Sequence, residues 1–376
     1  MVRISRSTAF FLLIAAMAVF VVVSCETPVT EPVAEDPPTV YVAGYYFNAG
    51  VLTPCYWTDA AKNDLPLPSG ATGAEGTSIV IDGTDIWVGG WYHDASSVRV
   101  PCVWKNGANR YTLERVSGYA SEVASITVHN GQLYAAGFFT DSSGVEHPCY
   151  WINKDSGSTL GLSTTVGRAT GIVWAGTSIY ASGYYLPSGA GSDTACYWLV
   201  ADPIGAPTVS AQTDLPKTTG SMSHGSGIAM SGSTPCVSGY YTETDSTSTR
   251  NRACYWFGNS TVVPLSGPGW YDSWEATCIC VSDGVVFTAG DCMTSTEEYF
   301  GCSWQGTIYS LTGTGAFSEN YPKAIGVGGG TVYLAGSYWS TGYGSLVPCE
   351  WKGTNLQTLP GNTDSDAQAL GICIVE

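Results

Sequence analysis

One short block of residues recurs along this chain at a nearly constant interval. Each copy has four residues, with Cys at the second position and Trp at the fourth. The cysteines of the block are Cys55, Cys102, Cys149, Cys196, Cys254, Cys302 and Cys349. Successive copies are 47, 47, 47, 58, 48 and 47 residues apart. A fixed period of this size is the sequence signature of a repeat architecture, in which each copy builds one supersecondary unit.

Each repeat carries the pattern of four short strands. A block of aromatic, any residue, small residue and Gly precedes every Cys block, with Cys236 the one departure from the aromatic. A block containing Ile lies further upstream, and turns such as Asn130-Gly131 separate the two, because Asn and Gly tolerate the positive φ of a tight hairpin. A turn and a short alternating strand follow the Trp. Four antiparallel strands, a to d, at this period are typical of one β-propeller blade.

The two ends of the repeat region complement each other. The first repeat begins at strand b near Thr39, whereas residues 371–375 have the pattern of a strand a with no repeat after them. Joining them would complete a seventh blade and hide sheet edges that would otherwise promote aggregation. The sequence therefore predicts an all-β fold, a single seven-bladed β-propeller over residues 39–376 with four antiparallel strands per blade. The C-terminal strand a would close it by joining the N-terminal strands b to d.

The N-terminal segment has the pattern of an export signal. Arg3 and Arg6 precede an apolar run over residues 9–23. This run is shorter than the roughly 20 residues that span a bilayer comfortably, and it has the length and flank of a secretory signal.

The end of this run, Val22-Val23-Ser24-Cys25, resembles the lipobox of bacterial lipoproteins in the relaxed form of spirochaetes. The resemblance implies a signal peptide over residues 1–24 and a membrane anchor through a lipid on Cys25. An ordinary signal peptide or an uncleaved anchor is the alternative. Residues 25–38 are acidic and Pro-rich, a composition typical of an extended tether.

Taken together, the repeats and the N-terminus resemble those of bacterial exported propeller lipoproteins. This resemblance covers the whole chain after the signal segment, and it implies a membrane-anchored protein of the bacterial cell envelope, periplasmic or surface-exposed. Kelch and WD40 propellers share the fold class, but their signature dipeptides are absent, so their partners do not transfer to this chain.

Charge and motifs argue against several classes of partner. Without residues 1–24 the chain keeps 12 basic and 31 acidic residues, a net charge of −19. Such a surface repels the phosphates of nucleic acids, so no nucleic-acid partner is expected. The sequence has no phosphate-binding loop, HExxH pair, complete calcium loop, nucleophile elbow or CxxC pair. We therefore expect no cofactor and no metal, and we nominate no catalytic residue.

The cysteines of the repeat are expected to be buried thiols. Equivalent positions on packed sheets lie about 10 Å apart, beyond the roughly 7 Å between Cα atoms that a disulfide tolerates. These cysteines should therefore act as small apolar side chains and not bridge one another. Cys292 and Cys302 flank one b–c hairpin and form the one pair for which we expect a disulfide.

The repeat stops repeating at one position, four residues before the Ile of strand a. We call the residues at this position the polar ring: Glu75, Glu122, Arg168, His224, Glu275, Tyr321 and Gln368. If they lie at the junction of strands d and a, seven blades would gather them around one mouth of the central channel, on the face that also carries the b–c loops. A variable polar ring on a repeated scaffold is typical of a binding site. The alternative is that each side chain satisfies only local backbone or water. An acidic ring would favour a cation or an amine-bearing ligand.

Paired aromatic residues begin several b–c hairpins. The pairs are Tyr45-Tyr46, Trp91-Tyr92, Phe138-Phe139, Tyr184-Tyr185 and Tyr240-Tyr241. Successive strand residues face opposite ways, so one ring of each pair can reach the surface and stack on a sugar or contact a protein. The alternative is that both rings pack between blades.

Two functions remain, besides that of a purely structural surface protein. The first is a non-enzymatic cell-envelope lipoprotein that binds or scaffolds a protein or glycan through this top face and the b–c loops. The alternative is a carbohydrate- or peptide-cleaving propeller enzyme that uses the carboxylates of Glu75, Glu122 and Glu275. Such an enzyme needs two carboxyl groups about 5–10 Å apart in a deep pocket.

Overall fold

The computed structural model describes most of the repeat region. It covers residues 37–376 apart from 154–158, 202, 204–206, 218–220, 247, 268–270, 295–297, 312–318 and 362–364. The predicted signal peptide, Cys25 and the tether up to residue 36 lie outside the described residues.

All regular elements of the described residues are β-strands. The strands near the two ends are β1 (Thr39–Asn48), β2 (Val51–Thr58), β3 (Ala61–Asp64) and β28 (Ala367–Val375). The strands between them are β4 (Gly73–Asp82), β5 (Asp85–His93), β6 (Arg99–Lys105), β7 (Asn109–Thr112), β8 (Ser121–His129), β9 (Gln132–Thr140), β10 (Glu146–Ile152), β11 (Thr159–Gly161), β12 (Gly167–Ala175), β13 (Ser178–Tyr185), β14 (Thr194–Ala201), β15 (Thr208–Asp214), β16 (Ser223–Ser231), β17 (Thr234–Thr244), β18 (Thr249–Phe257), β19 (Thr261–Pro264), β20 (Tyr271–Ser282), β21 (Val285–Thr294), β22 (Tyr299–Gln305), β23 (Ile308–Leu311), β24 (Asn320–Gly328), β25 (Thr331–Ser340), β26 (Ser345–Lys352) and β27 (Asn355–Thr358). The predicted all-β class is confirmed. In the part of the chain that is described, no helix is long and apolar enough to cross a membrane.

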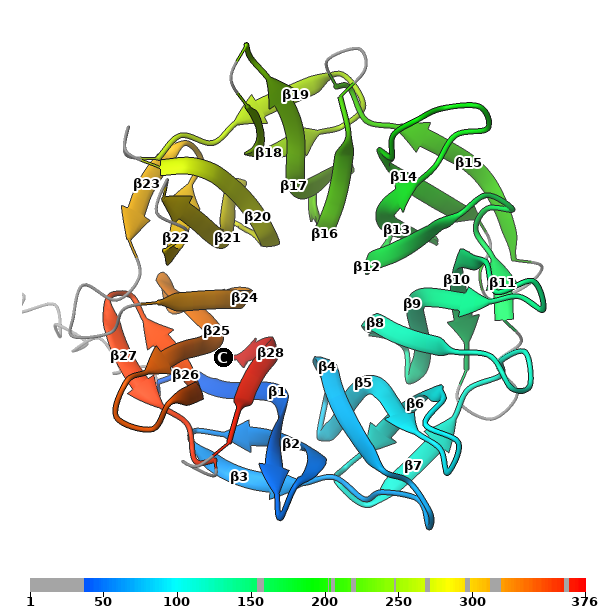
Figure 1. Ribbon diagram of the computed structural model, residues 1–376, viewed down its shortest axis with the longest axis vertical. Coiled ribbons are helices and arrows are strands. Elements are labelled where there is room, and N and C mark those ends of the chain that lie inside the picture. The colour runs from blue at the N-terminus through cyan, green and yellow to red at the C-terminus, as the bar shows by residue number, and fades with distance from the viewer. Residues whose placement is uncertain are drawn as a thin grey trace, which may run out of the picture. The chain divides into compact units, whose positions relative to one another are not determined.

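The strands form antiparallel sheets of four consecutive strands. Five such sheets are β8–β11, β12–β15, β16–β19, β20–β23 and β24–β27. β4–β7 forms the same arrangement, and a single parallel pair between Leu52 and Gly73 joins it to β2. β28 pairs with β1 over eight positions, and β1 continues to β2 and β3. Within residues 37–376 the sheets radiate around a central opening, with β4, β8, β12, β16, β20, β24 and β28 innermost (Figure 1).

The hairpin turns have the predicted backbone. Asn130 and Gly131 adopt φ of 52° and 74°, and Asp283 and Gly284 adopt 50° and 74°. Two successive positive φ values match the right-handed twist of the flanking strands, which is why short turns of this kind connect the two innermost strands of a sheet.

The repeated Trp residues fill the gaps between neighbouring sheets. All seven are at most 1% exposed: Trp57, Trp104, Trp151, Trp198, Trp256, Trp304 and Trp351. A buried aromatic ring of this size removes about 150–250 Å² from water, which is worth roughly 4–6 kcal/mol at about 25 cal/mol per Å². The indole N–H of Trp104 donates to the carbonyl of Pro66, just beyond the outermost strand of the preceding sheet, at 2.9 Å. Trp57, Trp151, Trp256 and Trp304 make the equivalent bond.

The cysteines behave as predicted. The repeat cysteines other than Cys302 are free and buried. Cys292 and Cys302, on the adjacent strands β21 and β22, form a disulfide with their Cα atoms 6.4 Å apart. The cross-link joins one hairpin, so it constrains a short loop locally.

Candidate functional site

The polar ring lies inside the innermost strands, and the predicted location at the d–a junction is wrong. Glu75 is the third residue of β4, and Glu122 is the second residue of β8. Each innermost strand has a one-residue bulge just after the ring position, and the strand pairs with its neighbour on both sides of this bulge. The innermost strands therefore begin earlier than predicted. The ring residues therefore keep a fixed backbone register, and all seven are half-buried.

A repeated Gly explains how the ring residues are positioned. This Gly ends the aromatic-containing block and lies on the strand next to the ring residue: Gly44, Gly90, Gly137, Gly183, Gly239, Gly290 and Gly336. A Cβ added to Gly137 would lie 1.9 Å from the carbonyl oxygen of Glu122, and the corresponding distance from Gly290 to Glu275 is also 1.9 Å. No other residue fits at these positions, so each Gly allows the close approach of the strand that carries the ring residue.

Five of the seven ring residues contact a side chain of the preceding sheet that sequence reasoning missed. These partners lie three positions before the repeated Cys, at the start of the third strand of that sheet. Arg99 donates from Nη1 to Oε2 of Glu122 at 2.7 Å. Glu146 accepts two bonds from Arg168, from Nε at 2.6 Å and from Nη2 at 2.8 Å. We call Arg99, Glu122, Glu146 and Arg168 the arginine sector.

The same contact recurs further along the polar ring, with histidine and tyrosine in place of arginine. His224 Nε2 lies 2.8 Å from Oδ2 of Asp193, and its ring stacks on Tyr184 with the centroids 3.8 Å apart. Tyr321 lies against the ring of Tyr299 at 5.8 Å. The sequence does contain a signal for these partners. The residue three positions before the repeated Cys changes together with the ring residue of the next repeat.

Glu75 differs from the other acids of the ring. The residue at the partner position of the preceding sheet is Leu52, which offers no charge. Burial and the nearby carboxylate of Glu122 raise the pKa of Glu75 to about 7, while Arg99 opposes the rise. Glu75 is therefore partly protonated near neutral pH.

A second acid accompanies Glu275. Asp291 lies directly opposite Glu275 on β21, where most other repeats have an aromatic residue. Lys323 donates to Oδ2 of Asp291 at 2.9 Å, whereas Oδ1 is buried with no hydrogen-bond partner among the described residues. Asn251 donates to Oε1 of Glu275 at 2.5 Å. We call Asn251, Glu275, Asp291 and Lys323 the carboxylate sector.

Burial sets the protonation of the carboxylate sector. It raises the pKa of Asp291 against the opposing charge of Lys323, and it raises the pKa of Glu275 against the hydrogen bond from Asn251. A cavity of about 230 Å³ is lined by Asn251, Glu275, Asp291, Trp274 and Tyr299 among others.

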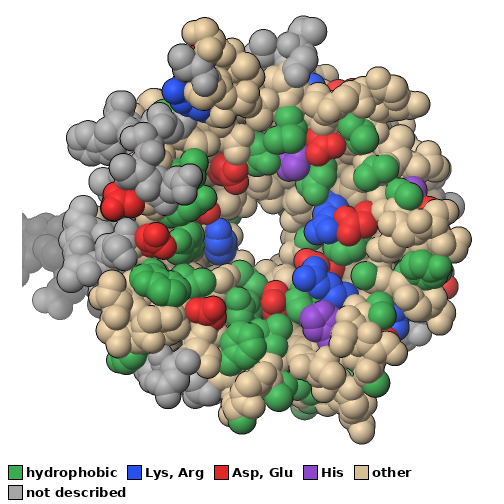
Figure 2. Space-filling model, viewed as in Figure 1, with side chains coloured by type: hydrophobic (Ala, Val, Ile, Leu, Met, Phe, Trp, Pro, Cys, Tyr) green, Lys and Arg blue, Asp and Glu red, His purple; other side chains and the backbone are tan. Residues whose placement is uncertain are grey.

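The arginine sector borders a larger and more open pocket. Its volume is about 420 Å³, and its lining includes Arg99, Arg168, Glu146, His93 and Phe138. Burial and the charge of Arg99 lower the pKa of His93, so this imidazole is neutral at pH 7. Figure 2 shows acidic, basic and histidine side chains gathered around the central opening on the face that it draws.

The opening itself is lined by small residues, by several isoleucines and by Lys323. A cavity of about 180 Å³ is bordered by residues of all the innermost strands. The bulge residues Thr77, Thr170 and Thr277 each donate a hydroxyl hydrogen bond to a carbonyl of the next innermost strand. These bonds tie neighbouring sheets together, so the channel wall has a structural role.

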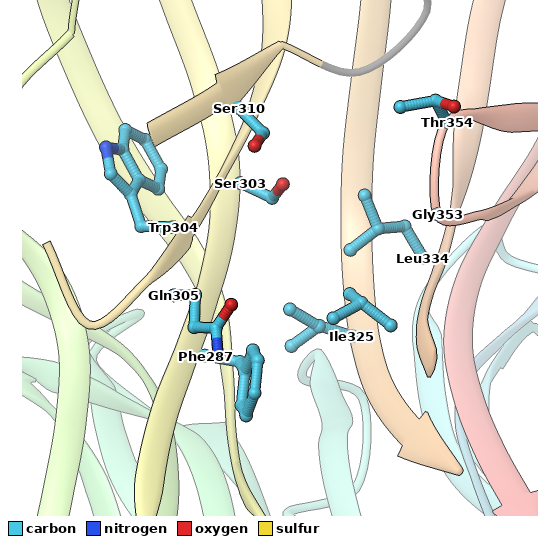
Figure 3. Close-up of a pocket in the computed structure, with 10 residues that line it drawn as sticks. Phe287, Ser303, Trp304, Gln305, Ser310, Ile325, Leu334, Gly353 and Thr354 are labelled. Carbon is cyan, nitrogen blue, oxygen red and sulfur yellow. The ribbon is translucent and has the colours of Figure 1, made fainter. Parts of the chain in front are cut away.

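Another cavity lies between two sheets and away from the polar ring. Phe287, Trp304, Ile325 and Leu334 line its apolar part, and Ser303, Ser310, Gln305 and Thr354 add polar groups (Figure 3). Its volume is about 160 Å³, and no ionisable side chain belongs to its lining. It therefore offers no acid–base chemistry.

The aromatic pairs pack against the polar ring more than they face solvent. None of their members is exposed: Tyr45, Tyr46, Trp91, Tyr92, Phe138, Phe139, Tyr184, Tyr185, Tyr240 and Tyr241. Phe138 lies under the guanidinium of Arg168 at 4.1 Å, and Trp91 lies under that of Arg99 at 4.5 Å. The first ring of these pairs thus positions charged groups.

Among the described residues, no three His, Cys, Asp or Glu side chains are grouped to hold a metal ion.

Comparisons with known proteins give structural matches only. No protein-family model and no curated protein matches this chain. One similar solved structure is the β-propeller domain of the Trilobed protease from Pyrococcus furiosus, which is 12% identical over 88% of this chain and 96% of that chain, with a TM-score of 0.52. An ulvan lyase bound to its saccharide is 8% identical over 77% of this chain and 85% of that chain, with a TM-score of 0.50.

A Pyrococcus horikoshii acylaminoacyl peptidase is 11% identical over 87% of this chain, with a TM-score of 0.51, and this chain spans about half of that peptidase. At such low identities these likenesses carry the fold and no activity. The described part of the chain is therefore a β-propeller built from four-stranded antiparallel sheets.

Proposed function

We propose that the fold is a seven-bladed propeller closed by pairing of the two chain ends. The pairing of β28 with β1 supports this, because it gives β1–β3 the innermost strand that they otherwise lack. The sheet β28–β1–β2–β3 then has the same four-strand order as each later sheet. Its link to β4 is a single residue pair, so we count β4–β7 as a separate blade.

We also propose that the protein is an exported lipoprotein of a bacterial cell envelope, anchored through Cys25. The support is the sequence of residues 1–38 alone. Mass spectrometry of the full chain expressed in a bacterium tests it: a diacylglycerol-modified Cys25 at the N-terminus is expected. A chain that keeps Met1, or begins elsewhere, contradicts it.

The function that the geometry supports best is binding or scaffolding of a protein or glycan on the top face, without catalysis. One observation carries this proposal. Ionic and aromatic contacts hold the side chains of the arginine sector in place, yet three of them, Arg99, Glu146 and Arg168, line an open pocket of about 420 Å³. Pre-ordered side chains lose little conformational entropy when a ligand arrives, which favours binding.

A ligand screen tests this proposal. The full-length protein, purified in detergent, is immobilised and probed with a glycan array and with envelope proteins of the host bacterium. We expect a bound ligand that is lost when the pair is removed in Arg168→Gln/Glu146→Gln. Arg110→Gln is the matched control, since Arg110 stacks on Tyr92 at 4.7 Å and does not border the pocket. Capture that survives the double substitution contradicts binding at this sector.

A second candidate function, cleavage of a carbohydrate or peptide, is favoured by the carboxylate sector. Glu275 and Asp291 face each other on adjacent strands, where Cβ atoms lie about 4.5–5.5 Å apart, and both line one cavity. Two neighbouring carboxyl groups with raised pKa values suit general acid–base or nucleophilic catalysis. Release of reducing ends or new amino termini from acidic polysaccharides or peptides, abolished by Glu275→Gln, would support it. Turnover unchanged by Glu275→Gln would exclude it.

A further inference from the structure

Two arginines reach the pocket of the arginine sector with hydrogen-bonding capacity to spare. The side chains of Arg99 and Arg168 are 41% and 37% exposed. Arg99 uses only Nη1 for Glu122, and Arg168 uses Nε and Nη2 for Glu146. Among the described residues, this leaves Nε and Nη2 of Arg99 and Nη1 of Arg168 without a hydrogen bond. Two guanidinium groups can therefore donate to a ligand between them.

The positions of both guanidinium groups are fixed before any ligand arrives. Each one is stacked on a buried aromatic ring and held by a carboxylate. The pocket wall is also braced, because Arg115 donates to the carboxylate of Asp94 at 2.9 Å and to the carbonyl of Tyr119 at 2.9 Å. Asp94 in turn accepts bonds from the backbone N–H groups of the β5–β6 hairpin. The pocket is thus preorganised on several sides.

We propose that this pocket binds the carboxylate of a uronic acid residue in an acidic glycan. The inference rests on the proposed binding function of the top face and names its ligand class. A planar guanidinium presents parallel N–H donors that match the two oxygens of a carboxylate, and charge-assisted bonds of this kind are the stronger ones.

Charge opposes an anion less at this location than elsewhere on the protein. The chain has few cations and a strongly negative net charge, so an anionic ligand is repelled from most of its surface. In the arginine sector two carboxylates are offset by two guanidinium groups, and the local charge is close to zero. A ligand with one carboxylate per sugar unit can approach there.

The pocket fits a sugar better than an acidic peptide. Ser97, Thr140 and Glu146 add hydroxyl and carboxylate groups to the lining, which suit the hydroxyl groups of a sugar ring. The described lining comes from the β5–β6 and β9–β10 hairpins, from residues 118–120 and from Arg168 of β12.

Calorimetry on the full-length protein in detergent tests the inference. The probes are tetragalacturonate and its carboxyl-reduced, neutral counterpart. We expect the acidic sugar to bind at least about tenfold more tightly than the neutral one, and Arg168→Gln and Arg99→Gln each to weaken it by about tenfold. Arg168→Lys keeps the positive charge but loses the paired N–H donors of the guanidinium group, so we expect the affinity for tetragalacturonate to fall about fivefold. Arg110→Gln should stay within about twofold.

The comparison of the two sugars on the unmodified protein keeps the test decisive if an arginine variant folds poorly, because it needs no substitution. Equal affinity for the acidic and neutral sugars, or a preference for hexaglutamate over both, would overturn the inference. If another ligand is captured and is lost on Arg168→Gln, only the ligand class is wrong. If no top-face substitution affects any capture, the proposed function fails as well.

Discussion

The arginine sector and the carboxylate sector both combine ring and partner positions of neighbouring repeats, to which the carboxylate sector adds Asp291 and Lys323, and the two sectors balance charge in different ways. In the arginine sector each carboxylate has its own guanidinium partner, and both arginines are more than a third exposed. In the carboxylate sector two acids share Lys323, and Oδ1 of Asp291 is buried without a hydrogen-bond partner among the described residues. The repeat therefore fixes where the backbone lies and leaves the side-chain chemistry free to differ.

The largest expected effect tests the part that the two sectors share. Gly137→Ala and Gly290→Ala should each lower the free energy of unfolding by about 3 kcal/mol or more, because the new Cβ collides with a ring-residue carbonyl. Urea denaturation measures this loss. Gly161→Ala is the control, since its nearest neighbour atom is 3.9 Å from the added Cβ. A loss below about 1 kcal/mol in either sector would contradict the explanation that both sectors depend on the same close approach of backbone at the repeated Gly.

Removal of the shared cation should separate the sectors. Lys323→Met leaves Asp291 as a buried acid without its ion pair and should cost about 3 kcal/mol at pH 8. The cost should shrink in acid, because Asp291 then takes up a proton. Addition of Asp291→Asn should recover most of the stability. Urea denaturation of the three proteins at pH 5 and pH 8 checks this, and a pH-independent loss would contradict the role of Asp291.

The effect of Glu75, which lies beside the arginine sector, on the stability of the protein should depend on pH. Because its pKa is raised from 4.5 to about 7 in the folded state, the folded protein binds this proton more tightly than the unfolded chain does. Its contribution to stability is present below about pH 4.5 and is lost as pH rises through about 7. Glu75→Gln should therefore stabilise the protein by about 1–2 kcal/mol at pH 8 and hardly at pH 4. Thermal unfolding at both pH values measures it, and a destabilised variant at pH 8 would exclude the assignment.

The smallest effect is expected in the exposed pair. Arg99→Gln should change the unfolding free energy by about 1 kcal/mol or less, since an ion pair this exposed to water contributes little to stability. The same denaturation experiment detects a larger loss. A loss as large as that of Lys323→Met would mean that both sectors are structural and would weaken the binding proposal.

The sequence predicted the parts of the fold that depend on short-range pattern. The Cys and Trp spacing predicted the four-strand repeat, and the spacing of Cys292 and Cys302 across one hairpin predicted their disulfide. Contacts such as Arg99 with Glu122 join different repeats, so no local pattern reveals them. The polar ring was identified, but its strand was placed too late because a bulge lengthens the innermost strands without a sequence signal of its own. Asp291 was missed because it stands where most other repeats have an aromatic residue, so the repeat pattern does not mark it as part of the site.

A crystal structure of the protein with tetragalacturonate tests the central claim most directly, namely that the top face is a preorganised binding site. We predict density for one sugar carboxylate within hydrogen-bonding distance of both Arg99 and Arg168, with the side chains of the arginine sector unmoved. Sugar density elsewhere on the protein, or an arginine sector that stays empty at saturating ligand, would contradict the account.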